Sequence, residues 1–283
     1  NGLIKISTRY PDIYPVYTFA ESDEARRRLR QQERSRAYPQ NEPVLKSLLE
    51  KRNELAAILG YDNFADLVTA DKMIGSGTNA QKFIDRVSKL AKPAQEADVK
   101  QLLKRLKQID SGASEVNRWQ VSYLQELIKK EQYELDAAEV RQYFSYGKVR
   151  DGIFELVSNL FNVEIRPWQT STWHPSVESY EMLQDGKVFA QFHLDMHPRE
   201  GKYQHAAAFG TRAGISGRQL PLTTLVCNFP GEKDPNELME FDQVSTFLHE
   251  FGHLIHGLFA GNHRWDSLTG IATEWDFVEA PSQ

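Results

Sequence analysis

Residues 241–259 read FDQVSTFLHEFGHLIHGLF, and this stretch decides how the rest of the sequence is interpreted. Its large apolar residues recur every three or four positions, at Phe241, Val244, Phe247, Leu248, Phe251, Leu254, Ile255 and Leu258. An α-helix turns once every 3.6 residues, so this spacing gathers them on one broad side. We therefore predict a helix that is packed into the core and ended by Gly261, a residue suited to a helix C-terminus.

A His-Glu-x-x-His motif lies inside this predicted helix, at residues 249–253. His249 and His253 are four residues apart and share one helix face, so both imidazoles can bind one tetrahedral metal ion. Glu250 is rotated by about 100° from His249, which places its carboxylate beside the ion without making it a ligand. The motif predicts a zinc site at which Glu250 takes a proton from a zinc-bound water. His256 is expected to pack in the core or to hydrogen-bond near the metal.

A catalytic zinc ion also needs a third protein ligand and one open position. After the helix a loop leads to Gly270, and Thr273 with Asp276 resembles a capping pair that opens a second helix. Glu274, Asp276 or Glu279 could return from that segment to the metal, and the spacing alone leaves the choice open. Glu274 and Asp276 could instead accept a hydrogen bond from a ligating imidazole.

In the sequence before this region, helical patterns give way to strand and turn patterns near Trp168. The first ~160 residues carry apolar stripes at helical spacing and are predicted to be mostly helical, ending with a helix at 149–161. Asp185-Gly186 separates two apolar runs, 180–183 and 188–194, and predicts a β-hairpin. Further strands are expected at 206–209 and 222–227. The predicted fold is mainly α (α+β), with a small antiparallel or mixed sheet and metal-binding helices.

Several polar residues of the sheet region are expected to have structural roles. Four histidines fall there: His174, His193, His197 and His205. Among them His205 is the best functional candidate, because Tyr203 and the strand at 206–209 could border a cleft. Arg199, Glu200 and Lys202 are expected to form structural ion pairs. Cys227 lies in an apolar run and is expected to be an inert core thiol.

Composition restricts the possible partners and compartment. The net charge of −5 argues against nucleic acid, which needs a clustered positive field. The basic run at 26–36 is interleaved with glutamate, as on a solvated helix face. One cysteine excludes an intrachain disulfide framework and fits a reducing compartment, so a cytoplasmic location is expected. Since no apolar stretch reaches the ~18–20 residues of a membrane span, no membrane association is expected.

The segment HEFGHLIHGLF followed by WDFVEAPSQ resembles the thimet oligopeptidase, oligopeptidase A and dipeptidyl carboxypeptidase family of zinc metallopeptidases. In that family the glutamate of the F-V-E-x-P-S-Q motif is the third ligand, which corresponds to Glu279 here. The 25 residues between His253 and Glu279 match the family pattern. The resemblance also covers Gly60-Tyr61, residues 192–195 and residues 198–203, and so extends over nearly the whole chain. It implies a zincin-like fold with one zinc ion per chain, and short peptides as substrates.

The resemblance also implies that the sequence is a piece of a longer protein. Family members have a helical segment before this region and a long helical part after the P-S-Q motif. We expect residues 1–165 and 166–283 to be the helical and the sheet-plus-zinc parts of one incomplete catalytic unit. An oligopeptide endopeptidase is expected, with a dipeptidyl carboxypeptidase or a catalytically weak peptide-binding fragment as alternatives. Self-association, or association with the missing C-terminal part, is possible because removing a packed half exposes apolar surface.

Overall fold

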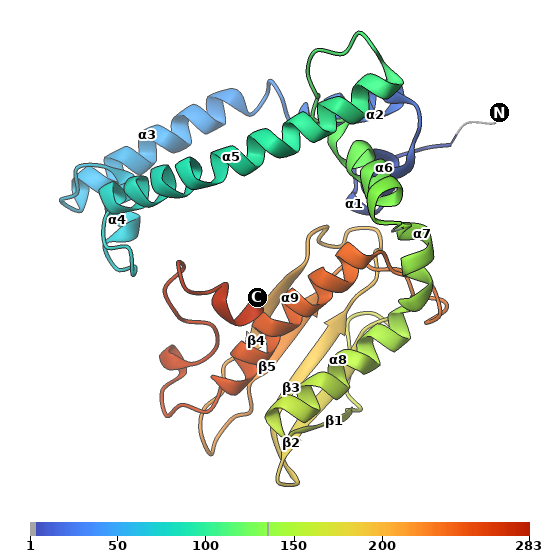
Figure 1. Cartoon of the computed structure of the whole chain (residues 1–283). Helices are drawn as coiled ribbons and strands as arrows, with labels where there is room; N and C mark the ends of the chain where they lie inside the picture. The colour runs from blue at the N-terminus through green and yellow to red at the C-terminus, as the bar shows by residue number, and fades with distance from the viewer. Residues whose placement is uncertain (1–3, 135) are drawn as a thin grey trace. The chain divides into compact units, whose positions relative to one another are not determined.

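The computed structural model describes residues 4–134 and 136–283, and the chain divides into two compact units, Asn1–Leu135 and Asp136–Gln283 (Figure 1). The first unit contains α1 (Tyr10–Phe19), α2 (Asp23–Arg34), α3 (Glu42–Ile58), α4 (Phe64–Thr69), α5 (Gly77–Ile109) and α6 (Val121–Tyr133). The second contains α7 (Ala137–Val140), η1 (Arg141–Tyr143), α8 (Tyr146–Phe161), β1 (Glu164–Pro167), β2 (Glu178–Gln184), β3 (Lys187–Asp195), β4 (Ala207–Arg212), β5 (Leu222–Val226), α9 (Phe241–Phe259), η2 (Asp266–Leu268) and η3 (Ala280–Ser282). The predicted mainly α class with one small sheet is confirmed.

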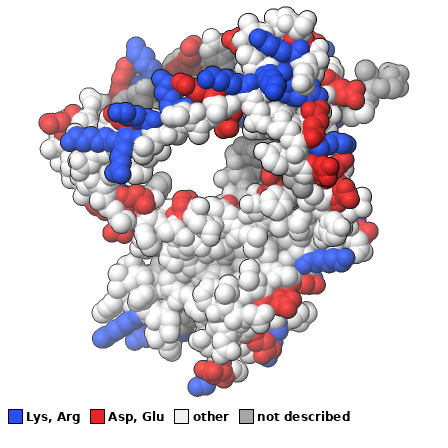
Figure 2. All heavy atoms as spheres, in the orientation of Figure 1, with Lys and Arg blue, Asp and Glu red and all other residues white. Residues whose placement is uncertain are grey.

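The helical unit is held by a small core and by polar contacts between its helices. Leu102 and Leu106 of α5 pack against Leu124 and Ile128 of α6. Basic and acidic side chains are interspersed over this unit in the view of Figure 2, as expected for solvated helices. One member of the basic run differs from that expectation: Arg26 is 3% exposed and stacks 4.1 Å above the ring of Tyr123 in α6. Its aliphatic stem and flat guanidinium allow it to pack where a lysine would stay solvated.

The second unit is built on a five-stranded sheet with the strand order β1-β2-β3-β5-β4. Strands β3 and β5 are parallel and the other neighbours are antiparallel, so the sheet is mixed. The hairpin predicted at Asp185-Gly186 is present between β2 and β3. Both turn residues have positive φ, 50° and 72°, the combination that a two-residue type I′ turn requires. Strand β1 has no counterpart in the prediction.

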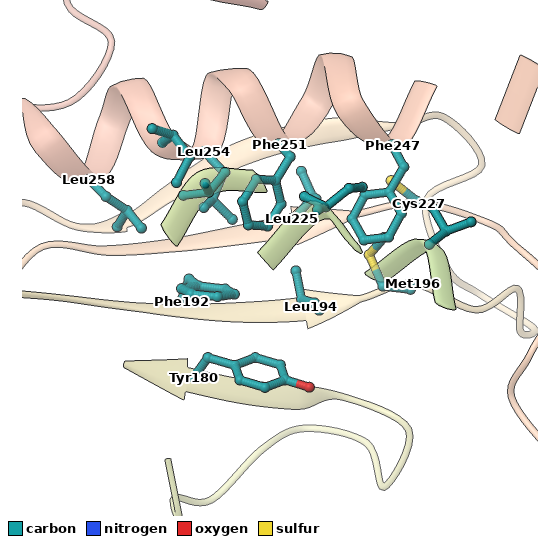
Figure 3. Packing of buried hydrophobic residues seen from close by; sticks show 14 of the residues in the cluster. Tyr180, Phe192, Leu194, Met196, Leu225, Cys227, Phe247, Phe251, Leu254 and Leu258 are labelled. Atoms are coloured by element: carbon teal, nitrogen blue, oxygen red, sulfur yellow. The ribbon is translucent and has the colours of Figure 1, made fainter. Parts of the chain in front are cut away.

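The core of the second unit lies between the sheet and the helices α8 and α9. Phe247, Phe251 and Leu254 project from α9 toward the sheet, where Phe192 and Leu225 meet them (Figure 3). All five are at most 2% exposed. The helix predicted from the apolar spacing of 241–259 is therefore present with those bounds and is anchored along its length. Each Å² of apolar surface that this stripe buries stabilises the unit by about 25 cal/mol.

The segment after α9 differs from the prediction. In place of a second α-helix from Thr273 there are turns at residues 275–279 and the short 3₁₀ helix η3. Pro281 limits an α-helix in this segment, because proline has no N–H to bond to the carbonyl of Phe277. Helix α8 shares the core of the sheet unit, so the compact units divide after residue 135. The functional division expected at residue 165 stays a prediction.

Candidate metal centre

Three side chains meet at the centre of α9. The ligand atoms of His249, His253 and Glu279 all lie within 4.8 Å of one another. Glu279 Oε2 is 3.2 Å from His249 Nε2 and 3.0 Å from His253 Nε2. Of the three carboxylates that spacing left open, Glu279 is therefore the one that reaches both imidazoles. The rings of the two histidines are nearly perpendicular, with centroids 4.9 Å apart.

This donor set fits a zinc ion. Zinc bonds of 2.0–2.1 Å in tetrahedral geometry separate neighbouring donor atoms by about 3.3 Å. Both distances from Glu279 Oε2 to the imidazole nitrogens are close to that separation. Two imidazoles and one carboxylate are also a donor combination that zinc accepts in catalytic sites, with a fourth position left for water or substrate.

Helix α9 fixes the two imidazoles before any metal arrives. Glu240 and Gln243 form a capping box at its N-terminus, and the apolar stripe fixes the rotation of the helix about its axis. His253 faces inward, with a side chain 10% exposed, whereas that of His249 is 37% exposed. The ring nitrogen Nδ1 of His253 is buried without a hydrogen-bond partner among the described residues.

Glu250 lies next to the three donors but outside the group. Burial raises the pKa of Glu250 above its ordinary value, while the imidazoles of His249 and His253 act in the opposite direction. The backbone of Ala208 in β4 also lies near the Glu250 carboxylate and acts to lower its pKa. Strand β4 is an edge strand of the sheet, with β5 as its neighbour on the other side. A carboxylate of raised proton affinity therefore lies between the three donors and an open sheet edge.

The histidines of the sheet have local partners, as expected. His174 Nδ1 is 2.7 Å from Ser176 Oγ, and His193 Nδ1 is 2.8 Å from Ser179 Oγ. His197 Nδ1 is 3.1 Å from the carbonyl oxygen of Phe229.

Two further histidines lie outside the donor group. His205 packs beside Tyr203, with ring centroids 5.3 Å apart, in the loop before β4. His256 is part-buried on α9, and its Nδ1 has no hydrogen-bond partner among the described residues. Burial lowers the pKa of His256, which favours its neutral form.

A buried ion-pair network supports the ends of β3 and β5. Lys202 Nζ donates to the carbonyl oxygens of Asp195, His197 and Cys227 at 2.8, 2.7 and 2.5 Å, and lies 3.0 Å from Asp195 Oδ1. Arg199 binds both carboxylate oxygens of Asp195, at 2.5 and 2.8 Å. The ion pairs expected of Arg199 and Lys202 are therefore present. Glu200 is exposed and forms no ion pair with another described residue. Asp195, the acceptor at the centre, was not singled out because a lone aspartate in a strand carries no distinctive spacing.

Cys227 lies at the end of β5, next to this network. It is 0% exposed, and burial raises the pKa of its thiol well above the ordinary value. A buried thiol of raised pKa is rarely a thiolate and therefore a poor nucleophile. The expected inert core role fits this position.

Sequence reasoning also missed two residues that touch the donor group. The single hydroxyl proton of Ser282 is shared between two acceptors, the Glu279 carbonyl oxygen at 2.9 Å and Glu279 Oε2 at 3.1 Å. Gly252 lies between the histidines, and its α-carbon faces the Pro281-Ser282 backbone. Glycine inside a helix costs about 1 kcal/mol relative to alanine, so this glycine was the signal that a close contact was needed there.

The sequence is similar to known peptidases over nearly its whole length. It matches the model of peptidase family M3 over residues 16–283. Saccharolysin of Saccharomyces cerevisiae is 33% identical, over 99% of this chain and 42% of saccharolysin. The thimet-like oligopeptidase of Dictyostelium discoideum is 32% identical, over 98% of this chain and 44% of that protein. Oligopeptidase A of Salmonella typhimurium is 29% identical, over 96% of this chain and 42% of that protein.

The chain thus spans less than half the length of the curated relatives it matches. The family match nevertheless covers both compact units and all four residues of the candidate centre. The resemblance inferred from the motifs HEFGH and FVEAPSQ is confirmed, and the chain belongs to peptidase family M3.

Proposed function

We propose that this protein is a zinc metallopeptidase that hydrolyses peptide bonds in short oligopeptides, with His249, His253 and Glu279 as the zinc ligands. The observation that carries the proposal is the convergence of these three donors within 4.8 Å in a chain of a peptidase family. The names of the relatives, which include oligopeptidases, support oligopeptides as the substrate class.

In the proposed mechanism Glu250 moves the protons. Zinc, when bound, supplies a Lewis acid that acidifies a water molecule and polarises the scissile carbonyl. The Glu250 carboxylate takes a proton from the attacking water and later delivers it to the leaving amine. Burial of Glu250 strengthens its affinity for that proton. The backbone of Ala208 in β4 favours the charged form of this carboxylate, which keeps it available as a base.

The exposed edge of β4 is the proposed binding edge for the substrate backbone. An extended peptide can add to an open sheet edge through main-chain hydrogen bonds. The described sheet has two edge strands, β1 and β4, and β4 is the one whose backbone contacts Glu250. A peptide lying along β4 would therefore run past the three donors.

Zinc content and hydrolysis together test the proposal. The purified chain and its Glu279→Ala and Glu250→Gln variants would be assayed for zinc by mass spectrometry and for cleavage of an internally quenched nonapeptide. We expect near-stoichiometric zinc in the wild type and in Glu250→Gln, clear loss in Glu279→Ala, and cleavage by the wild type alone. Equal zinc in the wild type and Glu279→Ala would refute the ligand set. Wild-type zinc without cleavage would favour the catalytically weak peptide-binding fragment.

The alternative of a dipeptidyl carboxypeptidase needs a separate substrate comparison. That activity requires recognition of a free C-terminal carboxylate, and no residue of this chain has been assigned to it. Matched peptides with a free or an amidated C-terminus separate the two activities. An endopeptidase should cleave both forms, whereas a dipeptidyl carboxypeptidase should cleave the free form only.

A cytoplasmic location remains part of the proposal. No helix in the described part of the chain is long and apolar enough to cross a membrane. One relative in Arabidopsis thaliana is named a probable cytosolic oligopeptidase A and another an organellar oligopeptidase A. Fractionation of the source cells, followed by detection of the protein, would decide between the compartments.

A further inference from the structure

Glu279 is the donor that the fold holds least firmly. His249 and His253 project from a helix anchored in the core, whereas Glu279 lies in a turn and its side chain is 60% exposed. A carboxylate in such a position loses rotamer freedom when it is fixed, and this loss opposes metal binding. We infer that Gly252 and Ser282 are positioning residues that hold Glu279 at the metal centre, an inference that rests on the proposed ligand set.

Gly252 provides the space into which the turn fits. A β-carbon at this position would lie 2.8 Å from the Pro281 carbonyl oxygen and 2.8 Å from the Ser282 α-carbon. Both are backbone atoms, so neither can move without moving the turn itself. The contact between α9 and η3 therefore depends on the missing side chain. Because Ser282 follows Glu279 by only three residues, a displaced turn would carry Glu279 away from both imidazoles.

Ser282 provides the second restraint. Its side chain is buried, with the residue 7% exposed, and its hydroxyl can donate to Glu279 Oε2 at 3.1 Å. That oxygen is the one nearest both imidazoles. A hydrogen bond of this kind orients a ligating carboxylate, and losing such a partner typically costs 10- to 100-fold in metal affinity. Gly252 thus sets the position of the turn, and Ser282 sets the direction of the carboxylate.

A second glycine of α9 supplies a matched control. Gly257 is buried on the same helix, but a β-carbon there would meet its nearest atom, Thr223 Oγ1, at 3.4 Å, an ordinary contact. Alanine favours helix equally at both positions. We expect Gly252→Ala to weaken zinc binding at least 10-fold, measured by competition with a fluorescent chelator. Gly257→Ala should bind zinc within about 3-fold of the wild type.

Variants of Ser282 separate positioning from folding. Ser282→Ala should weaken zinc binding about 10-fold while the unfolding midpoint of the zinc-free protein changes little. Ser282→Thr keeps the hydroxyl and should restore affinity. Loss of stability in the zinc-free Ser282→Ala protein, with unchanged zinc affinity, would overturn the inference, as would wild-type affinity in Gly252→Ala.

Glu279→Ala, measured in the same assay, separates the test of the ligand set from the test of the positioning residues. If it loses zinc while Gly252→Ala and Ser282→Ala bind normally, the ligand set stands and the positioning role is refuted. If Glu279→Ala keeps zinc, the ligand set itself falls and the positioning role falls with it.

Discussion

Asp195 illustrates how strongly one residue of the sheet depends on its charge. Its side chain is 4% exposed, and it accepts hydrogen bonds from Arg199, Lys202 and Trp173. Burial opposes ionisation of Asp195, but these three donors outweigh it and lower the pKa of the carboxyl to about 2. Breaking a buried pair of this kind leaves an uncompensated charge inside the protein. The ends of β3 and β5 therefore depend on a charged Asp195.

The depressed pKa of Asp195 predicts a defined acid sensitivity. Because the folded pKa of about 2 lies below the ordinary value of 3.8, the ionised carboxylate stabilises the fold above pH 3.8. About 2 kcal/mol should be lost as the pH falls from 4 to 2. Urea unfolding of the wild type and Asp195→Asn across this range measures the effect. The variant should be less stable at pH 6 and should lose less on acidification; parallel curves would contradict the assignment.

At the scale of the element, the β2–β3 hairpin offers a prediction with an internal control. Gly186 has a φ of +72°, and an alanine there should cost about 1–2 kcal/mol of unfolding free energy. Gly152 lies in the middle of α8, with open space around its α-carbon and no positive φ. Gly152→Ala should therefore stabilise the protein by up to about 1 kcal/mol. Equal effects of the two substitutions in chemical unfolding would contradict the turn assignment.

Strand β4 leads to a prediction about catalysis. Ala208→Pro removes the backbone N–H at the position that contacts Glu250, on an edge strand where proline is tolerated. We expect kcat/KM to fall at least 10-fold with zinc content unchanged, because an interaction worth about 1.4 kcal/mol or more is lost. Ala208→Ser keeps the N–H and should behave like the wild type. Full activity of the proline variant would show that catalysis does not need the N–H of residue 208, and would count against β4 as the substrate-binding edge.

The elements predicted from the sequence are those with a local cause. The apolar period of 241–259 defines α9, and Asp185-Gly186 defines the hairpin, because both depend on neighbouring residues. Strand β1 was not predicted because its four residues, EIRP, do not alternate between apolar and polar, and three of them are exposed. The second helix predicted after Thr273 is absent, because a capping pair favours a helix start but Pro281 has no N–H with which to continue it. The helical spacing of the motif predicted His249 and His253 as ligands. Glu279 could be chosen only from the family motif, because residues in a turn do not repeat at a regular spacing that would show which of them face the metal.

At the scale of the whole molecule, the apolar side chains of α3 stand out. The helix buries only Ala56, while Val44, Leu45, Leu49 and Ile58 are each more than half exposed. Exposed apolar residues repeated along one helix mark a surface that another chain or segment can cover. A second copy of this chain or the missing C-terminal part could cover this surface, and self-association stays a prediction.

Charge substitutions on α3 test that expectation. Leu45→Lys with Leu49→Glu keeps the net charge and removes two of the apolar side chains. The wild type should self-associate at micromolar concentration in multi-angle light scattering, and the double variant should be more monomeric. The control Ser47→Lys with Asn53→Glu alters polar exposed positions of the same helix and should behave like the wild type. A monodisperse monomeric wild type would count against the prediction.

Helix α9 carries the core stripe, two of the donors and the proposed base within nineteen residues. Its exposed positions are Phe241, Asp242, Ser245 and Leu248, and from residue 249 to residue 259 every residue is buried or half-buried. Evolution can therefore vary the first half of this helix far more freely than the second. A library of all single substitutions in α9, selected for stable folding and zinc uptake, should show tolerance at these four exposed positions and little at the buried Val244 and Phe247 or after Leu248. Divergence in this protein would then accumulate in loops and in the helical unit, while the second half of α9 stays almost unchanged.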